Sequence, residues 1–413
     1  MAFLYVNSVG VPWTKHSFSA GAEFDTSASK YRDHRIEGWR ERDIKASLRF
    51  GRALESAIQF FHENGGRGGF EEFTRLWREH ENNKELVYTK PEKDWATLNR
   101  AGQEMMLLYK IRQPSLPIPL ETSIFQREIE KEVFPGHPEL GGITHAGKLD
   151  IIAKVDPNHP LLPKIQWDEK KGLFRPVIVD IKTSGKDFHE RVGISALHAQ
   201  LRNYSWLTGI RDVAILQFKK AGHALKKGSS VTLLTDSVKF KAGDEAVVCA
   251  VEDEQAYLVR NDDELELMNM AQGRGIGLNG KKGKLQSGKD ADARRDVWLE
   301  QNADLVDVDV LTRQRLQFNA GIVKDQYAED AGRTVARQIT GIVNCWKSNS
   351  WPMEFGIGYP KDNTKDPYFR AFVEDDKMFR EQMFSKSATD TFDDLIVVDE
   401  DPEEGGGHGD DSV

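Results

Sequence analysis

The chain has 413 residues, of which 39% are hydrophobic and 30% are charged. This composition is that of an ordinary globular protein, and the length suits one large domain or a domain with an insertion. Two cysteines, Cys249 and Cys345, are too few for a disulfide framework or a cysteine-built metal cluster. The formal net charge of −9 is concentrated at the C-terminus, where the segment from Thr389 onward has ten acidic residues and no Lys or Arg. The rest is near neutral, so the charge does not exclude a nucleic-acid partner.

The N-terminal segment "MAFLYVNSVGVPWTKHSF" lacks the basic start and the long apolar run of a signal peptide. The chain also contains no apolar run of about 18 residues, the length that a membrane span needs. We therefore expect a cytoplasmic protein without a membrane partner, located in the bacterial host cytoplasm if a phage encodes it.

The first part of the chain is predicted to be largely helical, because apolar residues recur at spacings of three and four. The expected helices are at 46–66, 71–80 and 95–111. Alternating or continuous apolar patterns then predict strands. These strands are at 123–134, 142–155, 176–182 and 212–220, with a helix at 194–209. This order predicts an α/β fold with a small mixed β-sheet flanked by helices.

Residues 223–302 interrupt that order with several short strand patterns separated by turn residues, which indicate an inserted small β-barrel. Within it, the segment 274–295 is rich in Gly and has seven Lys or Arg against two Asp. This loop either contacts phosphates of DNA through Lys281, Lys282 and Lys284 or is simply a solvated loop.

The core pattern is expected to resume with a strand over 303–312 and a long helix ending near residue 348. The resulting division is 1–222 for the first part of the core, 223–302 for the inserted module and 303–386 for the remainder of the core. Residues 387–413 are acidic, rich in Gly and predicted to be disordered.

The candidate chemistry begins with the stretch "RPVIVDIKTSG" over 175–185, in which an acid and a lysine interrupt an apolar strand. Asp180 and Lys182 share one face because strand side chains alternate. Asp150, in "GKLDII", supplies a carboxylate on a second strand. Burying charges is costly without compensation, and carboxylates from paired strands can hold Mg²⁺ or Mn²⁺. Such a site activates water and stabilises a phosphodiester transition state.

These motifs together resemble the PD-(D/E)XK nuclease superfamily, specifically its RecB-like exonuclease branch. The family pattern is G–x–x–D, then (D/E)–x–K, then a helix with Q–x–x–x–Y, preceded by a helix with a metal-binding His or Glu four residues after a glycine. The matching residues here are Gly147 with Asp150, Asp180 with Lys182, Gln200 with Tyr204, and Gly51 with Glu55. The resemblance covers about 27–220 and, more weakly, 303–355.

The resemblance implies a restriction-endonuclease-like core with Glu55, Asp150, Asp180 and the Ile181 carbonyl as metal ligands. Lys182 would position or polarise the attacking water. Two further residues, Gln200 and Tyr204, would orient the site and contact DNA. Many relatives also bind an iron–sulfur cluster through one N-terminal and three C-terminal cysteines. The corresponding C-terminal region of this chain has none, so we expect no such cluster.

The resemblance implies a metal-dependent DNA exonuclease of recombination, repair or phage DNA processing. The alternatives are a structure-specific endonuclease on the same site and a catalytically silent DNA-binding scaffold. The expected partners are DNA and, as a second candidate, a recombination or single-strand-binding protein. For His145 a structural role is favoured over DNA contact, and His189 and His198 are interpreted as helix-surface or capping residues.

Overall fold

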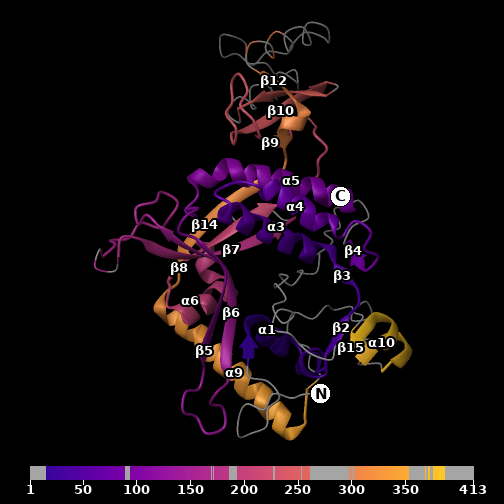
Figure 1. Cartoon of the computed structure of the whole chain (residues 1–413), viewed down its shortest axis with the longest axis vertical. Coiled ribbons are helices and arrows are strands. Elements are labelled where there is room, and N and C mark those ends of the chain that lie inside the picture. The colour runs from indigo at the N-terminus through magenta and orange to yellow at the C-terminus, as the bar shows by residue number, and fades with distance from the viewer. Residues whose placement is uncertain are drawn as a thin grey trace, which may run out of the picture.

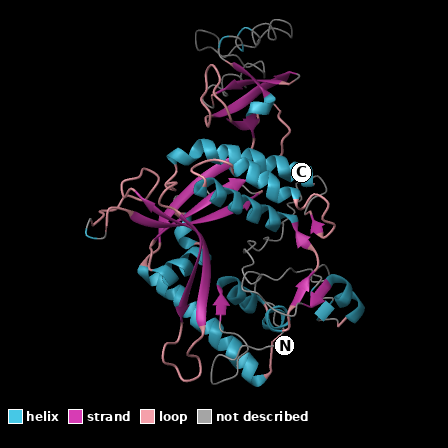
Figure 2. Cartoon of the chain, viewed as in Figure 1, coloured by secondary structure: helices cyan, strands magenta, loops and turns pink. Residues whose placement is uncertain are grey.

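The computed structural model describes residues 15–386 apart from several internal gaps. The gaps are at 89–93, 169, 171, 186–192, 227, 253, 261–296, 298, 300, 302, 353–367, 369–370 and 373–374. Lys281, Lys282, Lys284, His189 and the acidic tail therefore lie outside the described residues. The described part is a mixed α/β structure with two principal sheets (Figures 1 and 2).

The larger sheet is six-stranded and mixed, as the sequence predicts, with the order β1-β6-β7-β8-β14 and β5 paired to β6. Strands β6 and β7 are antiparallel, β7 and β8 are parallel, and β8 and β14 are antiparallel. The strands are β1 (Lys15–Ser17), β5 (Ile124–Glu132), β6 (Thr144–Val155), β7 (Arg175–Ser184), β8 (Asp212–Lys219) and β14 (Arg315–Ile322).

Three helices cover one face of this sheet, and their buried stripes form its largest hydrophobic core with side chains from β6, β7 and β8. They are α3 (Ala46–Glu63), α4 (Gly69–Arg78) and α5 (Trp95–Arg112), accompanied by β3 (Ile44–Lys45), β4 (Leu86–Val87) and the 3₁₀ turn η2 (Gln113–Ser115). Phe50 of α3 and Phe73 and Trp77 of α4 are fully buried there. Helical spacing of apolar residues thus produces the packed face that the sequence predicts.

The opposite face is covered in part by α6 (Ala199–Thr208), the 3₁₀ turn η4 (Ile194–Leu197) and α9 (Asp325–Ser348), and α1 (Phe18–Thr26) packs against α9. Parallel strands need a crossover connection, and α6 lies in the connection from β7 to β8. At its C-terminus Gly209 adopts the left-handed conformation (φ 76°) that ends the helix.

The second sheet has five strands in the order β12-β11-β10-β9-β13 and lies beyond α5 in Figure 1. They are β9 (Ser230–Leu233), β10 (Glu245–Glu252), β11 (Gln255–Val259), β12 (Asp304–Asp307) and β13 (Leu311–Thr312), with the turn η5 (Val308–Val310) between the last two. In the described residues β12 and β13 are the two ends of an open order, so the expected closed β-barrel is not formed.

A second correction concerns the strand expected in the core at 303–312. It forms β12 and β13, which pair with β11 and β9 of the second sheet, and the core sheet resumes only at β14. The alternation of exposed Leu305 and buried Val306 would suit either sheet, because a period of two identifies a strand and not its neighbour.

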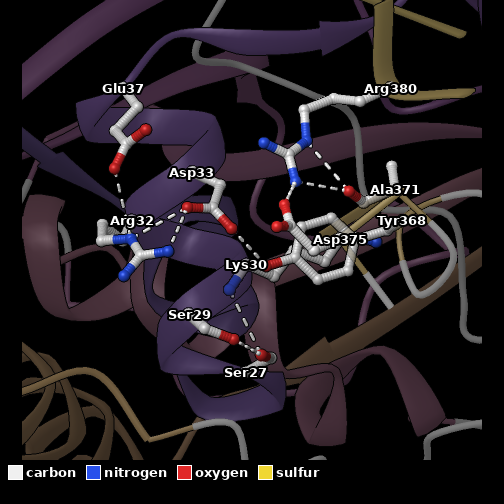
Figure 3. Close-up of polar contacts among 10 residues, drawn as sticks. All are labelled: Ser27, Ser29, Lys30, Arg32, Asp33, Glu37, Tyr368, Ala371, Asp375 and Arg380. Carbon is white, nitrogen blue, oxygen red and sulfur yellow. Dashed lines mark hydrogen bonds and ion pairs between the residues drawn. The ribbon is translucent and has the colours of Figure 1, made fainter. Parts of the chain in front are cut away.

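Segments near the two ends of the chain are joined by a small strand pair and a polar cluster. Strand β2 (Trp39–Glu41) pairs with β15 (Phe384–Lys386), next to α2 (Ala28–Tyr31), the π-helical turn η1 (Arg32–Ile36) and α10 (Lys377–Met383). Tyr368 donates its hydroxyl to buried Asp33 at 2.6 Å, and Arg32 donates to the same carboxylate (Figure 3). Arg380 donates to the Ala371 carbonyl. The strand pair and the hydrogen bond between Tyr368 and Asp33 join the C-terminal segment to the N-terminal one, and the Arg380 contact is internal to the C-terminal segment.

Candidate active site

The candidate site lies where β6 and β7 stop pairing with each other. Their register runs from Val155 opposite Arg175 to Ile151 opposite Val179, and Asp150 and Asp180 come next on each strand. Beyond the last pair the Ile181 N–H donates to Asp150 Oδ2 at 2.8 Å. The strand end thus brings together two carboxyl groups that are 30 residues apart in the sequence. The resemblance implied the Ile181 carbonyl as a ligand, whereas the contact at Asp150 is made by its N–H.

Asp180 and Lys182 share the face of β7 that α6 covers, as strand alternation predicts. Lys182 Nζ lies 3.3 Å from Asp180 Oδ2 and donates a hydrogen bond to Gln200 Oε1 at 3.0 Å. The Asp180 side chain is only 2% exposed, and its Oδ2 atom accepts no hydrogen bond, so Lys182 acts on it through charge alone. A buried carboxylate oxygen normally accepts a hydrogen bond, and Asp180 Oδ2 lacks one.

Gln200 and Tyr204 extend from α6 toward the site, one helical turn apart. Gln200 Nε2 donates to the Tyr204 hydroxyl, which donates to the Lys148 carbonyl, each at 2.9 Å. A side chain at Gly147 would bring its Cβ to 2.9 Å from Tyr204 Cε1 and from Leu207 Cδ1. Glycine therefore lets α6 approach β6 closely enough for the Tyr204 hydrogen bond, which explains the glycine of the G–x–x–D motif in packing terms.

Helix α3 brings Glu55 within electrostatic reach of these groups. A Cβ on Gly51 would lie 3.8 Å from Thr183 Oγ1, and Glu55 follows one turn later. Burial raises the pKa of Glu55 well above its usual value, and the negative charge of Asp150 raises it further. Burial, followed by the charge of Asp180, raises the pKa of Asp150 to about 7. Three acids and Lys182 therefore share one poorly solvated region.

The donors at this site suit a hard divalent cation, since all three acids offer oxygen ligands and Asp180 Oδ2 is buried without a hydrogen bond. Within the described part of the chain, however, no three or more His, Cys, Asp or Glu side chains are arranged as a metal-binding group. The three carboxyl groups therefore suit such a cation in their ligand atoms and charge. They would have to move closer to one another to bind the same ion.

Two histidines near the site, His145 and His198, contact neither Asp150 nor Asp180 in the hydrogen bonds described here. His145 is fully buried and lies 2.8 Å from His16 Nδ1 through its own Nδ1, and 2.9 Å from Asn203 Oδ1 through Nε2. A fully buried side chain enclosed by two protein partners has the structural role that the sequence favoured for His145. His198 occupies the N-cap position of α6, where its side chain makes no capping hydrogen bond.

Sequence reasoning did not single out the polar residues on the same face of β8 and β14. Both strands contain Leu-Gln-Phe, and their register places Gln217 opposite Gln317. The available signal was a glutamine within an apolar strand pattern. Whether such a glutamine is functional depends on which part of the sheet the helices leave uncovered, and this cannot be predicted from the sequence.

Comparisons with known proteins give little further information. No family model matches the chain, and no curated protein matches it. A solved structure described as "Crystal structure of SSO0001" is similar at 13% sequence identity, covering 48% of this chain and 69% of that one, with a TM-score of 0.17. A likeness at this TM-score carries no argument. No helix in the described ranges is long and apolar enough to cross a membrane.

Proposed function

We propose that the chain is a metal-dependent DNA exonuclease that hydrolyses phosphodiester bonds. The observation that carries this proposal is the gathering of buried Asp180 and half-buried Asp150 and Glu55 around one lysine where β6 and β7 part. Asp150 has a pKa raised to about 7, and Asp180 keeps a buried oxygen without a hydrogen bond. Acidic groups with raised pKa values and incomplete hydrogen bonding are expected where a cation binds during function.

The arrangement of the larger sheet supports the proposed restriction-endonuclease-like core. An antiparallel pair, β6 and β7, carries the two acids, and a crossover through α6 leads to the parallel strand β8. The crossover helix presents Gln200 toward Lys182. Sequence motifs that lie far apart in the chain are thus adjacent in the way the resemblance implies.

In this proposal Glu55, Asp150 and Asp180 hold Mg²⁺ or Mn²⁺, and no iron–sulfur cluster takes part. The bound cation would lower the pKa of water and neutralise charge on the phosphate. Lys182 would keep a positive charge beside the reacting phosphate and orient the attacking water through its ammonium protons. Gln200 holds Lys182 in place, and Tyr204 holds Gln200, through the two hydrogen bonds described above.

The test is a cleavage assay on end-labelled linear DNA and on circular DNA of the same sequence, with Mg²⁺, Mn²⁺ or EDTA. We expect shortening of the linear DNA with either metal and none with EDTA. Cleavage of the circle would instead favour the endonuclease alternative. Binding of DNA without cleavage of either form, in any metal, would favour a silent scaffold and overturn the proposal.

Variants of Glu55 test its role separately from the strand acids. The Glu55→His variant should retain more activity than Glu55→Ala, because imidazole can also ligate a metal, and the difference should be larger in Mn²⁺ than in Mg²⁺. A fully active Glu55→Ala variant at low metal concentration would remove Glu55 from the ligand set.

A further inference from the structure

The face of the large sheet that carries Asp180 changes character along β7, β8 and β14. Toward one end, Ile178 and Val213 are fully buried beneath α6, and Ala196 of η4 packs with them. Toward the other end, starting at Lys182, the residues on this face are polar and half-buried. A sheet covered by helices on both faces has apolar residues throughout, so the change marks where helical cover stops.

The strand register defines this polar area, which we call the polar stripe. Lys182 lies opposite Gln217, and Gln217 lies opposite Gln317. The next row is formed in the same way by Ser184, Lys219 and Arg315. Paired residues on neighbouring strands face the same side, so all six belong to one surface. The residues between them, such as Leu216, Phe218 and Leu316, face α3 to α5 in the core.

The charge of the stripe has one sign. Among its six members three are basic and none is acidic, although the chain as a whole has a net charge of −9. Arg315 also lies 3.5 Å from Glu245 of β10, an exposed pair that reaches the second sheet. The stripe thus runs from Lys182 at the candidate site toward the base of the second sheet.

We propose that the polar stripe binds one strand of DNA next to the scissile phosphate. Lys219 and Arg315 contact phosphates, while the amides of Gln217 and Gln317 donate and accept hydrogen bonds along the same path. Three strands span about 10 Å, a width that matches a single backbone and not both strands of a duplex. Continuity with Lys182, and the presence of three basic and no acidic side chains among the six members, favour a polyanion over a protein segment as the occupant.

This inference rests on the proposed nuclease function, and binding and cleavage are therefore measured separately. Binding of a fluorescent single-stranded oligonucleotide is measured by anisotropy in EDTA over a series of salt concentrations. The double variant Lys219→Gln with Arg315→Gln is compared with wild type. The control removes the same charges elsewhere, with Arg333→Gln and Lys347→Gln on exposed positions of α9.

Each phosphate contact contributes about 0.7 to the slope of log affinity against log salt for single strands. We expect the stripe variant to lower that slope by about 1.4 and to bind more weakly at low salt, whereas the control keeps the wild-type slope. If the wild type cleaves with Mg²⁺ but the stripe and control variants have equal salt slopes of binding, the stripe proposal fails and the nuclease proposal stands. If the wild type neither binds nor cleaves, both proposals fail.

A measurement on the unaltered chain guards against a misfolded variant. Acetylation of Lys219 by a lysine-reactive ester, followed by mass spectrometry, should slow when the oligonucleotide is bound, whereas Lys347 should react at an unchanged rate. Equal acetylation of Lys219 with and without a saturating oligonucleotide would overturn the stripe as the binding surface.

Discussion

Two carboxyl groups in this chain, buried Glu104 and half-buried Asp150, differ in how many hydrogen-bond donors they receive. Glu104 of α5 is 8% exposed and accepts hydrogen bonds from Thr312 Oγ1 at 2.7 Å, Arg100 Nε at 2.9 Å and His223 Nδ1 at 3.0 Å. Burial acts to raise its pKa, but these donors outweigh burial and the pKa is lowered. At Asp150 burial and a neighbouring acid prevail, and the pKa rises to about 7.

Under the proposed function, this difference in donors separates a carboxyl group that holds the fold from one that serves catalysis. Two of the donors to Glu104, His223 and Thr312, come from the segments that lead into and out of the second sheet. Gln314 and Ala221 join the same segments by hydrogen bonds in both directions. The carboxylate thus joins α5 to both connections. At the candidate site Asp150 accepts one backbone hydrogen bond, from Ile181, and Asp180 Oδ2 accepts none. Fewer donors leave these carboxyl groups less compensated than Glu104, as the proposed cation site requires.

The largest expected effect is at the candidate site. Asp150→Asn should lower cleavage by at least about 10²-fold, since it removes charge that stabilises the transition state. The same change should raise the unfolding free energy of the metal-free protein by roughly 1–3 kcal/mol, because a tenfold change in acidity corresponds to about 1.4 kcal/mol. Cleavage assays and urea unfolding in EDTA measure the two effects.

Opposite signs of the two effects are what distinguish a functional acid from a structural one. A folded Asp150→Asn variant that cleaves like wild type would remove Asp150 from the site. A variant that is both inactive and less stable would show that Asp150 supports the fold in the same way as Glu104.

Glu104→Ala should give the reverse pattern. It removes the acceptor shared by His223, Thr312 and Gln314, whose Nε2 donates to Glu104 Oε2 at 3.3 Å. We expect a loss of about 2–4 kcal/mol of unfolding free energy. Cleavage by the fraction that remains folded should be close to wild type. Urea unfolding followed by cleavage at low temperature tests both statements, and stability equal to wild type would contradict the structural role.

Gly147→Ala tests the packing that places Tyr204. The added methyl group would lie 2.9 Å from Tyr204 Cε1, so overpacking should cost about 1–3 kcal/mol and weaken cleavage by displacing the Tyr204 hydroxyl. The matched control is Gly222→Ala, where a Cβ would meet nothing within 4 Å. Similar melting temperatures for the two variants would argue against close packing at Gly147.

Much of the candidate site could be predicted from sequence because its residues occur in pairs, each on one strand or one helix. The periodicity of a strand or helix fixes which side chains share a face. Alternation puts Asp180 and Lys182 on one face, and a helical turn puts Gln200 beside Tyr204. The Glu104 junction could not be predicted, since two of its donors, His223 and Thr312, are more than 100 positions away in the sequence. The open second sheet was missed for a similar reason, because strand patterns do not name their partners.

The smallest expected effect is a pH dependence at the Glu104 junction. His223 Nδ1 faces Glu104 and Nε2 lies 3.1 Å from the Thr97 carbonyl, so a protonated imidazole donates to both. The hydrogen bond with Glu104 raises the pKa of His223 above 6.5 against the opposing effect of burial. Its stabilisation is therefore complete below about pH 6.5 and is lost as the pH rises through the folded-state pKa.

Glu104 sets the lower limit of this window. Its pKa lies below 4.5, so its contribution is present above about pH 4.5 and is lost as the pH falls through the folded-state pKa. Arg100 stays charged throughout and does not alter either limit.

The difference in unfolding free energy between wild type and His223→Gln should therefore be largest between about pH 4.5 and pH 6.5, at about 1 kcal/mol. Subtracting the two urea-unfolding profiles cancels the other histidines. A difference that grows above pH 7 would mean that neutral His223, and not its protonated form, holds the junction.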